Sequence, residues 1–280
     1  MLDVAILGAG ELGGSLACVL ARRDLARTIR IIDPKGQVAA GKALDIMQMS
    51  PIDGFSTTVK GATEITSAAG CGILIVADRA SGGEWAGDDG ALLLTQISRL
   101  GSRSVVLCAG AEQRELVERG VRELGYHASR ILGTAPEALA AAIRALVALE
   151  TNGSPRDVAL MVLGVPPALA VVPWEDVTIA GAAATRLLDE PARRRLATRV
   201  APLWPPGPYA LATAAVEAVA CVAGRSSRVL SCFVAPDDTS RGRARTVALP
   251  VRLGAAGVVS VATPALSTQA RVALDTAMLL

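Results

Sequence analysis

The first half of the chain alternates short apolar runs with longer segments of helical periodicity, and this alternation restricts the fold more than any other feature. Short apolar runs between turn residues predict strands, and segments with apolar residues at helical intervals predict helices. Strands that alternate with helices form βαβ units, in which right-handed crossovers place the strands in parallel. We expect strands at 4–7, 29–32, 57–60, 73–76, 105–108 and 131–132, and helices at 15–22, 41–49, 88–100 and 112–124. The first half is therefore predicted to be a doubly wound α/β domain.

The second half lacks this alternation and predicts a smaller α+β domain, with the division placed at 1–138 and 139–280. An apolar helix at 209–223 is expected to be buried, because it is hydrophobic on all sides. The other expected elements are helices at 137–150 and 189–200, a strand at 158–163, paired strands at 229–234 and 246–253 with a polar turn at 237–245 between them, and a terminal helix from about Ser267.

Composition excludes several classes of protein. The 280 residues are 51% hydrophobic and 19% charged, which excludes a disordered chain, and a net charge of +2 gives no reason to expect a nucleic-acid partner. The long charge-free stretches contain prolines, so none of them predicts a membrane-spanning helix. Five cysteines without a CxxC pair, together with a single histidine, predict no metal site and favour a reduced, cytoplasmic protein.

A glycine-rich motif lies between the first expected strand and the first expected helix. It contains Gly8, Gly10, Glu11, Leu12 and Gly13. The first glycine permits a tight turn, the second lets the backbone approach a diphosphate, and the third lets the helix pack on the strand. The N–H groups at the start of the helix favour an anion. The motif therefore predicts a dinucleotide-binding site of the Rossmann type; the alternative is that the glycines only close a strand–helix turn.

Asp33 ends the second expected strand, about 20 residues after Gly13, as the dinucleotide-binding pattern requires. A carboxylate at this place accepts hydrogen bonds from the adenosine ribose, and it repels a 2′-phosphate. The sequence therefore predicts a nicotinamide dinucleotide as the partner, and NAD rather than NADP as the cofactor.

Several stretches, taken in their order and spacing, resemble a known family. They are Gly8–Gly13 with Ile31–Asp33, Gly41–Asp45, Asp88–Asp89 with Leu92–Thr95, Val162–Gly164, Val172–Pro173, Gly207–Tyr209 and Val247–Gly254. Together they resemble the lactate and malate dehydrogenases over nearly the full length, and the stretch at 41–45 is typical of the malate branch. The resemblance implies a Rossmann domain followed by a smaller α+β domain, NAD as cofactor, and a homo-oligomer, either dimer or tetramer.

The resemblance also implies a catalytic set. In this family a histidine exchanges a proton with the substrate oxygen, an aspartate orients the histidine, and two arginines hold the carboxylate and polarise the carbonyl. The histidine position falls at Pro166–Pro167, and the aspartate and the carboxylate-binding arginine fall at Leu139 and Ala142. The lid that carries the family's arginines has Ser81 and Gly87 in their places, and the Asn-Pro pair after the fifth expected strand is replaced by Ala109–Gly110. No catalytic residue is therefore predicted.

Other charged residues near these positions are given structural interpretations. His127 and Arg79 are expected to be solvated loop residues, and Asp88 with Asp89 to cap the following helix. Glu137 is interpreted as a first-turn helix residue, and Arg144 is expected to face away from Ala142, because two positions turn about 200° around a helix.

Two functions remain in view, and whether the chain is an enzyme is left open. The first is a protein of the family that binds NAD(H) but lacks the usual 2-hydroxy-acid dehydrogenase machinery. The alternative is a divergent NAD-dependent oxidoreductase that acts on a different, less charged carbonyl or hydroxyl substrate. An ordinary malate dehydrogenase is disfavoured, because loss of the acid–base group alone costs about 10²–10⁴-fold in rate.

Overall fold

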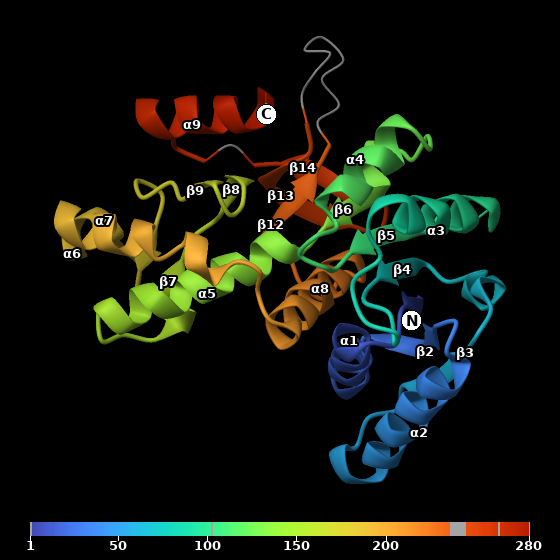
Figure 1. The fold of residues 1–280 in the computed structure, drawn as a ribbon. Helices are drawn as coiled ribbons and strands as arrows, with labels where there is room; N and C mark the ends of the chain where they lie inside the picture. The colour runs from blue at the N-terminus through green and yellow to red at the C-terminus, as the bar shows by residue number, and fades with distance from the viewer. Residues whose placement is uncertain (1, 102, 236–244, 263, 280) are drawn as a thin grey trace.

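The computed structural model describes residues 2–101, 103–235, 245–262 and 264–279 and has a parallel sheet at the centre of the first half (Figure 1). The strands of this half are β1 Leu2–Leu7, β2 Ala26–Ile32, β3 Thr58–Ala62, β4 Ile73–Val76, β5 Val105–Cys108 and β6 Ile131–Gly133. They lie in the order β3-β2-β1-β4-β5-β6, and all neighbours are parallel. The strand order reverses between β1 and β4, so the carboxyl ends of these two strands border the crevice where doubly wound sheets bind their ligands.

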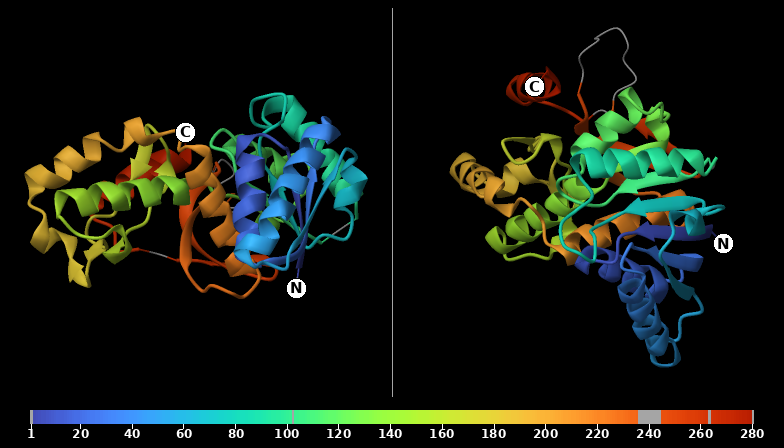
Figure 2. Two further views of the ribbon diagram at one scale, coloured as in Figure 1. Left: turned by 90° about the horizontal axis from the view of Figure 1, so that it is seen from below. Right: turned by 45° about the vertical axis from the view of Figure 1, so that its right-hand side comes forward.

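Helices cover both faces of this sheet (Figure 2). They are α1 Glu11–Arg22, α2 Gly36–Asp53, α3 Gly87–Arg99 and α4 Arg114–Arg122, with the 3-10 turns η1 Ile65–Ala68 and η2 Ala128–Arg130. Side chains alternate along β1, so Val4 and Ile6 share a core with α1, whereas Ala5 and Leu7 share one with α3 and α4. The layered arrangement fixes the loops at the carboxyl edge of the sheet, where the predicted site lies.

The second half extends the same sheet and adds a smaller one. Its elements are α5 Ala135–Glu150, η3 Pro155–Asp157, β7 Val158–Ala159, β8 Leu163–Val165, β9 Leu169–Val171, β10 Thr178–Ile179, β11 Ala182–Ala183, α6 Ala184–Leu187, α7 Glu190–Thr198, η4 Ala201–Leu203, α8 Pro208–Val222, β12 Val229–Val234, β13 Val247–Gly254, β14 Gly257–Val261 and α9 Thr268–Leu279. Strand β12 pairs antiparallel with β6, and the sheet continues through β13, β8 and β9, with β14 on β13. Strands β7, β10 and β11 form a separate antiparallel sheet.

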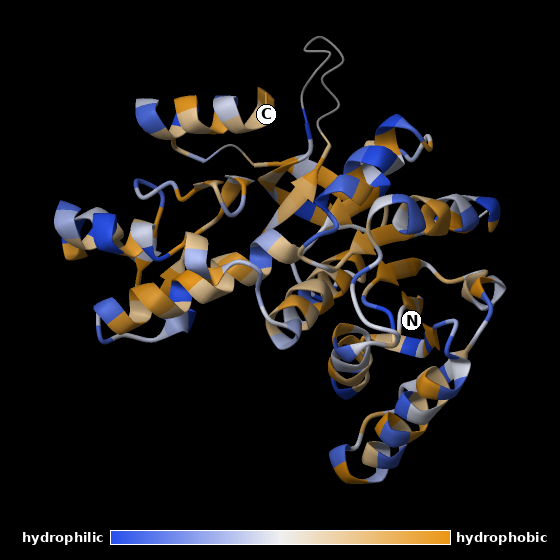
Figure 3. Cartoon of the chain, viewed as in Figure 1, coloured by the Kyte–Doolittle hydropathy of each residue, from blue (hydrophilic) through white to orange (hydrophobic). Residues whose placement is uncertain are grey.

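The expected fold class, a doubly wound parallel sheet of the Rossmann type followed by a smaller α+β part, is confirmed. The predicted division between residues 138 and 139 falls inside α5 and remains a prediction. Hydrophobic residues gather along the sheet strands, in contrast to the polar exposed faces of α4 and α7 (Figure 3). Helix α8 is mostly buried and packs against α1, as its apolar sequence predicts. Within the described ranges, every helix is too short or too polar to cross a bilayer.

One expected strand of the second half is wrong. Residues 158–163 contain β7 and the start of β8, which belong to different sheets. Between them the Val162 N–H donates to the Ser231 hydroxyl at 2.9 Å, so a side chain takes the donor that a continuous ladder would use. The sequence pattern did not predict β9, β10, β11, α6 or β14, which are all short. The expected polar turn at 237–245 lies outside the described residues except for Arg245.

Candidate functional site

The glycine motif forms the turn between β1 and α1 at the carboxyl edge of the parallel sheet. Gly8 has a φ of +123°, which side chains rarely adopt. A Cβ on Gly8 would overlap the Asp78 carbonyl oxygen, and a Cβ on Gly10 would overlap the Asp78 carboxyl group. A Cβ on Gly13 would overlap the Gly8 carbonyl oxygen. The three glycines therefore hold β1, α1 and the end of β4 in direct backbone contact.

The carboxylate of Asp78 lies on the N-terminus of α1. Its oxygens accept hydrogen bonds from the N–H groups of Leu12 at 3.1 Å and Gly13 at 2.9 Å. Its carbonyl accepts from the Gly10 N–H at 2.9 Å. Gly10 is the N-cap residue and has no side chain to satisfy the first N–H groups of the helix. Asp78, on the segment after β4, supplies the missing acceptor, and the helix dipole favours its negative charge.

Asp33 follows β2 and joins the glycine motif to the same segment. Its side chain is 1% exposed. One carboxylate oxygen accepts from the N–H groups of Ala9 and Ala80, both at 2.9 Å, and the other accepts from the Lys35 N–H at 2.8 Å. The predicted ribose acceptor is thus covered by the chain, with Ala80 supplying one of its donors.

The β4–α3 segment, defined as residues 77–86, is anchored at its other end by Glu84. The Glu84 carboxylate accepts from the N–H groups of Ala111 at 2.8 Å and Glu112 at 2.9 Å, which precede α4. Burial raises the pKa of the Glu84 carboxyl, although these two hydrogen bonds oppose the shift. The fully buried Gln113 donates to the Ala77 carbonyl at 2.9 Å. In this conformation the segment is therefore hydrogen-bonded to the sheet edge at both ends.

Arg79 is packed rather than solvated, and this corrects the expectation from the sequence. Its guanidinium stacks on Trp85 at 5.2 Å from the ring centroid and pairs with Asp89 at 2.9 Å. The expected capping role of Asp88 and Asp89 is also wrong. The N-cap residue of α3 is Ala86, without a side-chain cap, because Asp88 and Asp89 lie one step inside the first turn and pair with arginines.

The positions that the resemblance assigned to the substrate-handling groups carry apolar side chains. Leu139 on α5 is 0% exposed and belongs to a core cluster with Ile143 and Val147. Ala142 is half-buried on the same helix. Pro166–Pro167 form a cis peptide bond between β8 and β9. None of these side chains exchanges protons or pairs with a carboxylate.

His127 lies at the opposite edge of the parallel sheet. It is exposed and caps η2, where its Nδ1 accepts from the Ser129 N–H at 3.3 Å. The 3-10 turn η2 leads directly into the amino end of β6, whereas the glycine motif and Asp78 lie at the carboxyl ends of β1 and β4. The interpretation of His127 as a loop residue remote from the site agrees with this position.

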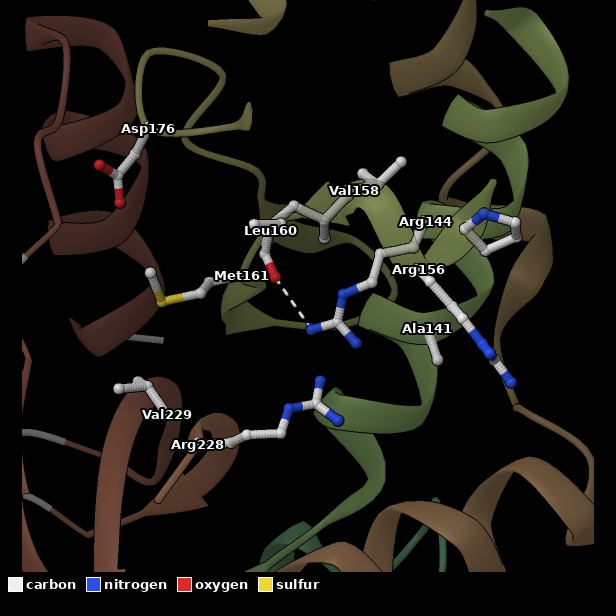
Figure 4. Close-up of a pocket in the computed structure, with 11 residues that line it drawn as sticks. Ala141, Arg144, Arg156, Val158, Leu160, Met161, Asp176, Arg228 and Val229 are labelled. Atoms are coloured by element: carbon white, nitrogen blue, oxygen red, sulfur yellow. Dashed lines mark hydrogen bonds between the residues drawn. The ribbon is translucent and has the colours of Figure 1, made fainter. Parts of the chain in front are cut away.

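An open pocket beside α5 contains Arg144, Arg156 and Arg228 (Figure 4). Arg144 faces this pocket, and it donates to Glu137 at 2.9 Å and to the Leu160 carbonyl at 3.1 Å. Glu137 lies in the first turn of α5, as expected; it is only 5% exposed and also accepts from the Ser231 N–H, which links α5 to β12. The half-buried Arg144 therefore has a structural role in this pocket.

The likeness to known proteins extends over almost the whole chain. No protein-family model matches it. A malate dehydrogenase of Thermomicrobium roseum is 27% identical over 288 aligned residues, which cover 97% of this chain and 93% of the relative. Another, of Salinibacter ruber, is 25% identical and covers 93% of this chain and 88% of the relative. The chain belongs to the lactate and malate dehydrogenase family.

Solved structures of the lactate and malate dehydrogenase family share the fold. The malate dehydrogenase of Salinibacter ruber has a TM-score of 0.84 at 24% identity, over 99% of this chain and 94% of that one. A lactate dehydrogenase of Cryptosporidium parvum, complexed with lactic acid and nicotinamide adenine dinucleotide, has a TM-score of 0.86 at 17% identity, with the same coverage.

Sequence reasoning about this family member found the glycine motif and Asp33 but missed Asp78, Glu84 and Gln113. A signal for Asp78 was present, because an acidic residue close behind the apolar run of β4 lies at the point where the strand order reverses. The partners of Glu84 and Gln113 carry no such signal, since they are backbone groups brought together by the fold.

Proposed function

We propose that this member of the lactate and malate dehydrogenase family binds NAD(H) and does not carry out the family's usual oxidation of 2-hydroxy acids. Two features support the cofactor: the glycine motif followed by Asp33, and the shared fold with a lactate dehydrogenase that holds nicotinamide adenine dinucleotide. A cytoplasmic location and a homo-oligomeric assembly remain predictions from the sequence and the resemblance.

One observation carries the second part of the proposal. The sequence contains a single histidine, and His127 lies at the amino edge of the sheet, away from the glycine motif. The positions that the resemblance assigns to the catalytic aspartate and the carboxylate-binding arginine hold Leu139, in an apolar core cluster, and the half-buried Ala142. A dicarboxylate would find neither a proton-transfer group nor a charge-assisted partner there.

The backbone of the glycine motif suits a diphosphate, but this conformation does not leave its donors free. The N–H groups of Leu12 and Gly13 already bind Asp78, and Asp33 already accepts from Ala80. A dinucleotide therefore fits only when the β4–α3 segment is displaced from α1.

The test combines binding with turnover. NADH is titrated against the purified chain and followed by nicotinamide fluorescence, and oxaloacetate and pyruvate are then added while absorbance is recorded. We expect saturable NADH binding and no measurable reduction of either acid. Turnover of oxaloacetate at ordinary enzyme rates would contradict the missing chemistry, and absence of NADH binding would contradict the cofactor assignment.

The alternative function is reduction of a less charged carbonyl compound by NADH. The apolar residues at Leu139 and Ala142 favour it over a dicarboxylate reaction, because they leave no cation for an acid to pair with. A panel of neutral aldehydes and ketones, assayed in the same way, separates the two: turnover of any member supports the alternative.

A further inference from the structure

We infer that Asp78 is an internal competitor for the cofactor's diphosphate, so that NAD(H) binds only after the β4–α3 segment leaves the N-terminus of α1. This inference rests on the proposed NAD(H) binding and adds a conformational step that regulates it. We call the Leu12 and Gly13 N–H groups and the space over Gly10 the cradle. The chain would then exist in a closed form, with the Asp78 carboxylate in the cradle, and an open form that accepts the dinucleotide.

The first support is that the two anions require the same donors. The Asp78 carboxylate uses both of its oxygens, one for the Leu12 N–H and one for the Gly13 N–H. Phosphate oxygens bind at helix N-termini through such N–H groups. The carboxylate also lies directly over Gly10, the glycine whose missing side chain lets a diphosphate approach. Two anions in this space would repel each other at close range, so occupation is exclusive.

The second support comes from a different residue. Asp33 is the acceptor expected for the adenosine ribose, and in the closed form one of its oxygens accepts from the Ala80 N–H. The β4–α3 segment therefore covers the diphosphate position and the ribose position together. Displacing the segment frees both, whereas moving the Asp78 side chain alone frees only one.

The segment has the means to move. Gly82, Gly83 and Gly87 have φ values of +99°, +75° and +54°, conformations that glycine adopts without strain. A Cβ on Gly82 or on Gly87 would meet nothing within 4 Å, so the backbone there borders open space. The far end is held by the Glu84 carboxylate on two N–H groups, and the Arg79–Asp89 ion pair and the Trp85 backbone N–H on the Ala77 carbonyl add to it, so these are the contacts that opening breaks. A hinge at these glycines would lift Asp78 and Ala80 off the cradle.

The experiment compares NADH affinity in the wild type, Asp78→Ala and Asp45→Asn. Asp45 is an exposed carboxylate on α2, so its variant changes the net charge equally without touching the cradle. We expect Asp78→Ala to tighten NADH binding by about tenfold or more, because the closed form loses its two hydrogen bonds to α1 and the open form becomes more populated. Asp45→Asn should bind as the wild type does. If Asp78→Ala fails to fold, Asp78→Asn removes the charge at nearly constant size.

A second readout uses inorganic pyrophosphate as the probe and the melting temperature as the signal. Pyrophosphate should raise the melting temperature of Asp78→Ala and leave that of the wild type nearly unchanged. Equal NADH affinity in the wild type and Asp78→Ala would overturn the competition while the cofactor assignment stands. Stabilisation of Asp78→Ala by pyrophosphate without NADH binding by any variant would overturn the cofactor assignment and leave Asp78 as the occupant of the cradle. No response of Asp78→Ala to either probe overturns both.

Discussion

The glycine-motif region and the region around α5 differ in what occupies their predicted site positions: carboxylates in the first and apolar side chains in the second. Around the glycine motif three carboxylates, Asp33, Asp78 and Glu84, are all bonded to backbone N–H groups. At α5 the positions that the resemblance assigns to the catalytic aspartate and the carboxylate-binding arginine hold Leu139 and Ala142. Every residue except proline keeps its backbone N–H, so the N–H groups of Leu12 and Gly13 at the start of α1 need an acceptor once water is excluded. At α5, by contrast, Leu139 is part of the core and has no polar group to satisfy.

The sharpest test of this contrast is to place a carboxylate at position 139 of α5. Leu139→Asp places a charge at a fully buried position without a partner, and we expect it to lower the free energy of unfolding by about 3–5 kcal/mol. Urea unfolding measures the loss. Leu149→Asp is the control, because Leu149 lies on the same helix but is 71% exposed, and it should change stability little. Comparable losses in both variants would mean that the site around Leu139 still admits water.

The second prediction concerns the buried Glu137 and asks how much its ion pair with Arg144 contributes to stability. Glu137→Gln keeps an acceptor for the Ser231 N–H but removes the charge that pairs with Arg144. We expect a loss of about 1.5–3 kcal/mol, as for hydrogen bonds to charged groups. Glu150→Gln breaks a more exposed pair with Arg195 and should cost about 0–1 kcal/mol. Urea unfolding measures the loss of free energy of unfolding in both variants. Equal losses would mean that the Glu137–Arg144 pair contributes no more than an ordinary surface ion pair.

The same contrast explains how much the sequence could predict. The glycine motif and Asp33 were predictable because local geometry dictates them: a turn with positive φ at Gly8, and an acidic residue after a strand. The element order was predictable because apolar runs repeat. The position of Asp78 on α1 was not, since it joins residues more than 60 apart and depends on which strands become neighbours. The two short strands at 158–165 were missed for the same reason, because a hydroxyl of distant β12 takes the N–H between them.

The contribution of Asp78 as an acceptor at the N-terminus of α1 can be measured as a change in the free energy of unfolding. Asp78→Ala leaves the N–H groups of Leu12 and Gly13 without their acceptor, so we expect a loss of about 0.5–2 kcal/mol, the range for an N-cap residue. Hydrogen exchange should show faster exchange of these two amides than in Asp45→Asn. Unchanged protection would mean that another acceptor replaces the carboxylate, and that these two N–H groups do not depend on Asp78.

The smallest expected effect is the contribution of Glu84 to the pH dependence of the free energy of unfolding, and the pKa shift gives its sign. Because burial raises its pKa above the usual 4.5, the native state holds the Glu84 proton more tightly than the unfolded chain does. Its contribution to stability is therefore largest below the unfolded pKa and is lost as pH rises through the folded pKa. The difference in unfolding free energy between wild type and Glu84→Gln isolates this group, since all other titrations cancel. We expect that difference to shift against the wild type as pH rises from 4 and to level off above the raised pKa. The opposite slope would mean that the hydrogen bonds from Ala111 and Glu112 outweigh desolvation, and that the β4–α3 segment is held more firmly at neutral pH than in acid.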